Sequence, residues 1–150
     1  MFPHPTAGVT CVGARDALLA WNVVVAGIDK GQARVIASKI RERDGGFSGV
    51  RALGLYLSQR EQIQISMNIE DPMRTAPEAV YAEISQAVSE MGGEVLEVEV
   101  IGMLPDTLVL PGSESRLDLL NLDSERVLSF RVNEYLETRA AREEIPDNLS

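Results

Sequence analysis

The sequence contains little histidine and little cysteine, which limits the chemistry that it can carry. Its 150 residues hold one of each, His4 and Cys11. One cysteine cannot form a disulfide within the chain, and one histidine with one cysteine falls short of the ligand set of a zinc site. We therefore expect no metal site. Cys11 lies in an apolar stretch, where a buried structural thiol is favoured over a nucleophile.

Long apolar runs are also absent. No stretch approaches the roughly 18 consecutive apolar residues of a transmembrane helix, and no basic segment followed by an apolar run opens the sequence as a secretory leader would. We therefore expect a cytoplasmic protein that does not act at a membrane.

The net charge of -9 is unevenly distributed. Residues 1–60 carry eight Lys/Arg and four Asp/Glu, whereas residues 61–150 carry six Lys/Arg and nineteen Asp/Glu. The acidity of the whole chain disfavours nucleic acid as a partner. The basic first part suits an anionic small molecule, and the alternative is a charged surface that keeps the protein soluble.

Apolar periodicity predicts six elements in the first two thirds of the chain. They are a strand at 17–26, a helix at 31–43, strands at 50–58 and 61–69, a helix between a capping box at 75–78 and the glycines at 92–93, and a strand at 94–101. Gly54 in the third element marks a weak point, a bulge or a close approach. The order is that of a ferredoxin-like βαββαβ sandwich, of class α+β, with both helices on one face of an antiparallel sheet.

The other face of that sheet is predicted to be polar and to carry no helix from residues 17–101. Leu96, Val98 and Val100 are expected to face the helices. The polar face then carries Asn22, Gln62, Gln64, Ser66, Asn68, Glu97 and Glu99. Such a face is wet, forms the floor of a site, or docks on a second layer. Paired carboxylates such as Glu97 and Glu99 can do acid–base chemistry, but on a strand they more often form the outer face.

Beyond the sandwich we expect a helical extension at 102–138 and a frayed tail at 139–150. The extension is predicted to hold a short helix at 106–110, a leucine-rich packed segment, and a last helix capped by Ser124. Four apolar side chains of this last helix are expected to face inward, namely Leu128, Val132, Tyr135 and Leu136.

The first 16 residues are rich in Pro, Thr and Gly, and two interpretations remain open for them. A loop of this kind brings backbone N–H groups close to a ligand, or it is an arm of turn residues that packs on the sheet. His4 would need a positioned partner to act as a general base. Arg15 can pair with a carboxylate, and the alternative is a salt bridge with Asp16 or an interaction with a helix end. The spacing of Gly13 fits neither a Walker loop nor a dinucleotide loop.

Seven stretches together resemble glutamate formimidoyltransferase, and more narrowly the carboxy-terminal subdomain of its transferase unit. They are HPTAG at 4–8, VGAR at 12–15, LLAWNV at 18–23, ARVIASKIR at 33–41, VRALG at 50–54, QISMN at 64–68 and VEVIGMLP at 98–105. The resemblance covers roughly residues 2–136. It implies transfer of a formimino group from N-formimino-L-glutamate to the co-substrate tetrahydrofolate, in histidine degradation, and two ferredoxin-like subdomains that hold the folate between their sheets.

The resemblance also assigns site residues. The folate-contacting stretch of the family corresponds to the opening loop, so the resemblance implies folate binding by Phe2, Pro3, His4, Pro5, Thr6, Ala7 and Gly8. Polarity and position add Arg15, Asn22 and Asn68 to the candidate site. The catalytic histidine of the family belongs to the amino-terminal subdomain, and His4 does not correspond to it. We therefore expect no catalytic residue here and no activity from this chain alone.

The partner is then an amino-terminal formiminotransferase subdomain, on a separate chain or in a longer protein of which this is a fragment. The alternative is a reused fold, a non-catalytic ferredoxin-like module that binds a small molecule or associates with itself through the sheet face.

Overall fold

A computed structural model describes residues 3–104 and 126–143, with side chains to residue 140 in the second segment. The described elements are β1 (Leu19–Ala26), α1 (Lys30–Ile40), a 3-10 turn η1 (Glu42–Asp44), β2 (Val50–Leu57), β3 (Gln62–Ile69), α2 (Pro77–Glu90), β4 (Glu94–Ile101) and α4 (Leu128–Glu143). The class is α+β, with a four-stranded sheet in the order β2-β3-β1-β4 and antiparallel neighbours. The predicted α+β class with an antiparallel sheet is confirmed, and most of the predicted bounds agree with the observed elements within two residues.

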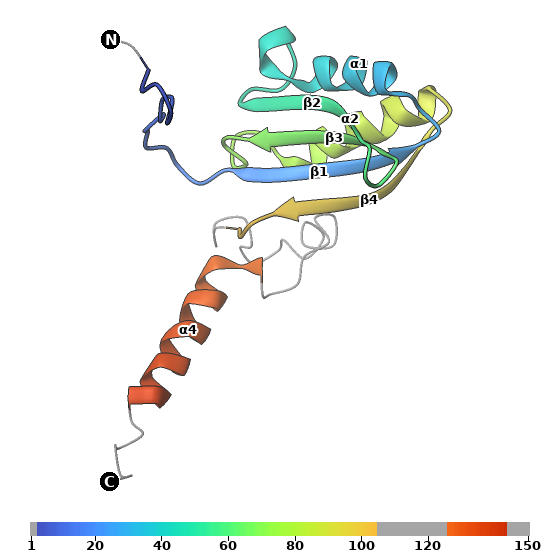
Figure 1. Cartoon of the computed structure of the whole chain (residues 1–150). Coiled ribbons are helices and arrows are strands. Elements are labelled where there is room, and N and C mark those ends of the chain that lie inside the picture. Colours follow the sequence, from blue (N-terminus) through green and yellow to red (C-terminus); the bar gives the residue numbers. More distant parts are fainter. Residues whose placement is uncertain (1–2, 105–125, 144–150) are drawn as a thin grey trace.

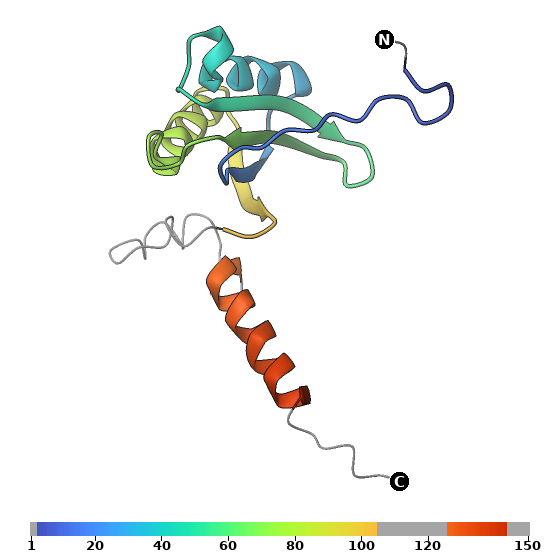
Figure 2. The same cartoon turned by 90° about the vertical axis from the view of Figure 1, so that its left-hand side faces the viewer.

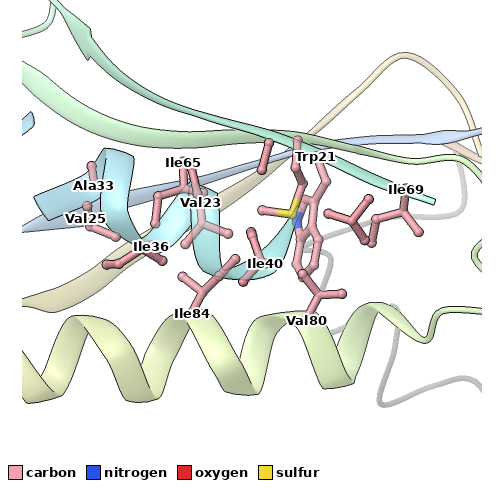
Figure 3. Packing of buried hydrophobic residues seen from close by; sticks show 14 of the residues in the cluster. Trp21, Val23, Val25, Ala33, Ile36, Ile40, Ile65, Ile69, Val80 and Ile84 are labelled. Carbon is pink, nitrogen blue, oxygen red and sulfur yellow. The ribbon is translucent and has the colours of Figure 1, made fainter. Parts of the chain in front are cut away.

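One face of the sheet packs against α1 and α2 (Figure 1). Strand β1 contributes Leu19, Trp21, Val23 and Val25, which alternate along it as a strand with one buried face requires. Helix α1 contributes Ala33, Ile36, Ala37 and Ile40, spaced so that they form one apolar stripe. Helix α2 contributes Val80, Ile84, Ala87 and Val88. Figure 3 shows side chains of this core packed between the sheet and the helices, among them Trp21, Ile36 and Ile84.

Helix α1 is shorter than the sequence predicts, because its carbonyls find partners outside the helix after Ile40. The backbone N–H of Phe47 donates to the Ile40 carbonyl at 2.9 Å, and that of Gly46 donates to the Arg41 carbonyl at 3.0 Å. Gly45 takes the left-handed conformation, with φ +93°, as predicted for the residue that ends this region. The start of α1 has a capping box that sequence reasoning missed, between Asp29 and Gln32.

The predicted capping box at 75–78 is wrong. Helix α2 begins after Ala76, which offers no side-chain cap, and Pro77 occupies the first turn as expected. The hydroxyl of Thr75 instead donates to the Ser48 carbonyl at 2.6 Å and ties the start of α2 to the loop before β2. A partner distant in the sequence therefore replaces the local cap.

The prediction that Leu96 faces the helices is also wrong. The pairing of β1 with β4 shifts between Val24, opposite Glu97, and Val25, opposite Val95. This bulge leaves Leu96 without a place in the alternation, and its side chain is 52% exposed while Val95 packs on the core.

Helix α4 leaves the sandwich, and both views show it projecting away from the sheet (Figure 2). A backbone bridge between Leu104 and Val127 precedes it, with Leu128 N–H donating to the Leu104 carbonyl at 2.9 Å. The expectation that four of its apolar side chains face inward is wrong, because the helix does not lie against the core. Leu128, Val132, Tyr135 and Leu136 are all exposed.

Helix α4 continues to Glu143, so the first five residues of the predicted tail are helical. The predicted helix at 106–110, the leucine-rich segment and the Ser124 cap lie outside the described residues. The division into an opening loop, a core at 17–101, an extension at 102–138 and a tail stays a prediction.

Candidate functional site: the open face of the sheet

The face of the sheet opposite α1 and α2, here called the open face, carries the polar residues that the sequence places there. The register sets Asn22 of β1 between Ser66 of β3 and Glu99 of β4. Two positions further along β1, Val24 lies between Gln64 and Glu97. Side chains at alternate positions share one face, so β3, β1 and β4 line up their polar groups in rows across the sheet.

Asn22 forms a hydrogen bond to one of the carboxylates on this face. Its side-chain amide Nδ2 donates to Oε2 of Glu99 at 3.2 Å, across neighbouring strands. Asn22 is 8% exposed and Glu99 is half-buried, so this contact is shielded from water in part. A hydrogen bond to a carboxylate is worth more than one between neutral groups, and it fixes the direction in which Glu99 presents its oxygens.

A groove of about 510 Å³ opens beside this pair. One wall is the β2–β3 hairpin, which Figure 2 shows extending beyond the sheet. The rest of the lining comes from residues of the open face on β3 and β4. The lining residues are Tyr56, Leu57, Ser58, Gln59, Arg60, Gln64, Glu99 and Ile101. The groove therefore combines apolar surface with one cation, one carboxylate and two amides, which is the mixture typical of small-molecule sites.

Gln64 stands out among the lining residues because it is 5% exposed. Its side-chain amide makes no hydrogen bond to any residue that the structure describes. Its amide atoms are not fully enclosed, so they remain reachable from the groove. Its neighbour on the same face, Gln62, does not line the groove and has a buried Oε1 without a partner within the described ranges. Gln64 thus offers the groove an amide that no described residue engages.

Val24 shows that part of the open face is shielded from solvent. It is 1% exposed, yet it lies on the open face and is not part of the core beneath the helices. The polar side chains of the same row, Gln64 and Glu97, pair with it on either side.

The structure puts the predicted folate loop outside the sheet. Residues 3–17 are exposed and run away from the start of β1 (Figure 1). His4 and Gly8 close a turn through two backbone hydrogen bonds of 3.0 Å, and Gly8 has φ +69°. The Nδ1 atom of His4 accepts from the backbone N–H of Thr6 at 3.3 Å and of Ala7 at 3.1 Å. His4 therefore organises its own turn.

The other predicted site residues are divided between the arm and the sheet. Phe2 lies outside the described residues, and Pro3, Pro5 and Arg15 are exposed on the arm. Asn68 is exposed on the open face opposite Ala20 and Arg51, while Asn22 lies at its centre. The structure thus brings Asn22 and Asn68 to one face, and no hydrogen bond or ion pair joins residues 3–17 to the rest of the described chain.

The prediction of a buried thiol is wrong, since Cys11 is free and exposed on the arm. Its apolar neighbours Val9 and Val12 are exposed as well. The physical reason is that the arm does not pack on the sheet, so local apolar character cannot bury the residue. Of the interpretations left open for Arg15, the salt bridge with Asp16 is not seen in the described residues.

Sequence reasoning missed the contribution of the hairpin. It assigned Ser58, Gln59 and Arg60 only to the connection between two strands, although they wall the groove. Gln64 was placed on the polar face and not singled out. The available signal was an arginine in a turn directly before an alternating polar strand, which is weak without knowledge of how far the hairpin extends.

Electrostatic shifts in the described residues lie away from the open face. The Glu83 carboxylate, whose Oε1 is 2.5 Å from Nζ of Lys39, raises the pKa of that lysine and links α1 with α2. The Arg41 guanidinium beside Asp44 lowers the pKa of that carboxyl.

No group of three or more His, Cys, Asp or Glu residues within 3–104 and 126–143 is arranged to hold a metal ion. Likewise, no helix in these ranges is long and apolar enough to cross a membrane.

Comparison with known proteins places this geometry in a family. A family model described as "Formiminotransferase domain" matches residues 20–127, which include the whole open face and the hairpin. The chain belongs to the formiminotransferase domain family. The matched segment begins after the exposed arm.

Several curated relatives share this formiminotransferase domain. The glutamate formimidoyltransferase of Streptococcus pyogenes serotype M1 is 34% identical over 120 residues, 80% of this chain and 40% of that protein. The glutamate formimidoyltransferase of Thermoplasma acidophilum is 29% identical over 126 residues, 84% of this chain and 42% of that protein. The formimidoyltransferase-cyclodeaminase of Rattus norvegicus is 30% identical over 138 residues, 86% of this chain and 25% of that protein. The chain therefore spans about two fifths of the glutamate formimidoyltransferases that it matches.

Proposed function

We propose that this formiminotransferase domain is the folate-binding, carboxy-terminal subdomain of a glutamate formimidoyltransferase. In this role it binds tetrahydrofolate and N-formimino-L-glutamate together with an amino-terminal subdomain, and the pair transfers the formimino group in histidine degradation. The names of the relatives support the reaction, and the two-fifths coverage supports a subdomain. A cytoplasmic location is part of the same proposal.

The fold supports this assignment. We propose that the sheet, with strand order β2-β3-β1-β4 and both helices on one face, is a ferredoxin-like sandwich. In such a sandwich the second face of the sheet is left for a ligand or a second layer. We propose that the open face meets the amino-terminal subdomain there, with the folate between them.

The observation that carries the proposal is the groove on the open face. Its volume of about 510 Å³ falls within the range of ligand sites. Its donor set fits a folate, because Gln64 and Glu99 offer groups for a polar heterocycle and Arg60 offers a cation for a carboxylate tail. Tetrahydrofolate, when bound, supplies the nucleophilic nitrogen that accepts the formimino group. The residues of this chain would hold and orient it and exclude water from the groove.

Proton transfer is left to the partner. Within the described residues the open face carries no histidine, and His4 uses its Nδ1 in its own turn. We therefore propose that this chain alone is inactive. The arm, with Pro3 to Gly8 and Arg15, is proposed to close over the folate when both halves are present.

Calorimetric titration with folinate, a stable reduced folate, tests the proposed function. The chain is titrated alone and after mixing with the amino-terminal subdomain of the Streptococcus pyogenes relative. We expect saturable binding that is tighter in the mixture, and formimino transfer only there. Absence of saturable binding in both formats would overturn the proposal and favour a non-catalytic module.

The second candidate function is self-association, and one feature favours it. Helix α4 exposes apolar side chains along its length, and such surfaces often lie in interfaces. Sedimentation of the chain at increasing concentration separates the candidates, since a module that works by self-association should dimerise without folate.

A further inference from the structure

We infer that Glu99, oriented by Asn22, and Gln64 together recognise the amino-pyrimidinone edge of the pterin ring. This inference rests on the proposed function and assigns the parts of the ligand to the two ends of the groove. Arg60 would then bind the carboxylate end of the folate. The observations that carry it are one oriented carboxylate, one amide in the groove lining that no described residue engages, and their common groove.

The carboxylate calls for N–H donors. Glu99 accepts one hydrogen bond, from Asn22 at 3.2 Å, and a carboxylate has capacity for about four. Because Asn22 is 8% exposed and lies on the central strand β1, it holds Glu99 in one direction. A pterin presents an exocyclic amine and a ring N–H side by side, and this pair matches the two oxygens of a carboxylate.

The amide supplies what the carboxylate cannot. Next to its two donors, the pterin edge carries a carbonyl oxygen, which a carboxylate would repel. The amide of Gln64 offers an N–H to such an oxygen, and no described residue uses that amide. Gln64 lies on β3 opposite Val24, and Glu99 lies on β4 opposite Asn22, so the two are diagonal neighbours across β1. Two strand spacings of about 4.8 Å and two residues of about 3.4 Å along the strand separate their backbones. Both side chains line the groove, so a flat ring between them can contact both.

The walls and charges of the groove favour this assignment over the other substrate. The aliphatic side chains of Leu57 and Ile101 provide apolar surface for a ring. The amidine of N-formimino-L-glutamate also offers two donors to a carboxylate. That ligand is small and carries two carboxylates, which would lie near Glu99 with Arg60 as the one basic side chain in the lining. We therefore place the pterin there.

The test compares three ligands with matched variants. The ligands are folinate, a reduced pterin without the tail, and p-aminobenzoyl-L-glutamate, which is the tail alone. The variants are Glu99→Gln, Gln64→Leu and the control Glu97→Gln, a carboxylate on the same face and strand that does not line the groove. Each is titrated with and without the amino-terminal subdomain, and its melting temperature is measured.

We expect Glu99→Gln to weaken folinate and the tail-free pterin by about 10-fold to 100-fold, because one carboxylate acceptor becomes a donor. The tail fragment should bind as before, and Glu97→Gln should behave as wild type. Gln64→Leu should weaken the same two ligands and leave the melting temperature nearly unchanged, since no described residue bonds to that amide. A purely structural Gln64 would instead lower it.

The failures of the two proposals are distinguishable. If wild type binds folinate and Glu99→Gln binds it equally well, the assignment of the pterin is wrong and the proposed function stands. If Glu99→Gln weakens the tail fragment or formiminoglutamate instead, the groove takes another part of the substrates. If wild type binds no folate in either format, the proposed function fails and the inference fails with it.

Discussion

A methyl group added at Gly54 tests how closely β2 packs on α1. A Cβ atom at this position would lie 2.4 Å from the carbonyl carbon of Ala33 and 2.4 Å from the backbone nitrogen of Arg34. These are main-chain atoms of a helix, so no side-chain rotation relieves the clash. Gly54→Ala must therefore push α1 away from the sheet.

The magnitude follows from two opposing effects. Overpacking costs about 1–3 kcal/mol, and rigid backbone on both sides puts this site at the upper end. Alanine regains about 0.5–1 kcal/mol over glycine within a strand. The net loss should be about 2 kcal/mol. With a urea m-value of about 1.5 kcal/mol per molar, the unfolding midpoint should fall by roughly 1 M.

Urea unfolding followed by circular dichroism measures this loss. Gly13→Ala is the matched control, because a Cβ at Gly13 meets nothing within 4 Å, and it should shift the midpoint little. Equal stability of Gly54→Ala and wild type would refute the close packing of β2 on α1. The short distances at Gly54 also decide between the three interpretations of this glycine, because they show a close approach of β2 to α1.

Three further outcomes are expected. Leu19→Ala should lower the free energy of unfolding by about 2–5 kcal/mol, because Leu19 is fully buried on a central strand; a near-neutral result in urea would contradict this position. Thr6→Val should weaken folinate binding in the mixture of both halves while unfolding stays within about 0.5 kcal/mol, and unchanged binding would exclude the arm from the site. Arg41 lowers the pKa of Asp44, so the carboxylate stabilises the fold above its ordinary pKa and loses this effect as pH falls through the folded value. Acid unfolding of Asp44→Asn should lack that component, and identical acid profiles would speak against the ion pair.

The sheet and its helices could be predicted because each follows one period over its whole length. Strand β3 alternates from Gln62 to Ile69, and α1 repeats its apolar residues at helical spacing, so local pattern and burial agree. The predictions that are wrong concern residues whose contacts come from parts of the chain distant in the sequence. Thr75 looks like a cap in sequence but donates to Ser48, 27 residues away. Leu96 continues an alternation that a bulge against β1 interrupts.

The sequence predicts which face of the sheet carries the candidate site, but it does not predict the shape of the groove. The alternation of β3 and the position of Asn22 predict a polar face, because each rests on side-chain direction along one strand. The groove depends on how the β2–β3 hairpin extends and on which polar group of the floor is buried without a partner. Neither is encoded in a local pattern. The arm fails for the opposite reason, since the apolar neighbours of Cys11 suggest burial and nothing packs over them.

The open face differs from an ordinary solvated sheet face in one physical respect. On a solvated face, polar side chains keep their hydrogen bonds to water and lose nothing on folding. Here Gln64 and Asn22 are each at least nine-tenths buried, and the amide of Gln64 is unpaired within the described chain. Gln64 therefore presents to the groove an amide that no described residue engages, and a ligand with complementary polar groups can bond to it. An apolar residue at position 64 would suit a face built only for self-association, so the amide favours a polar ligand.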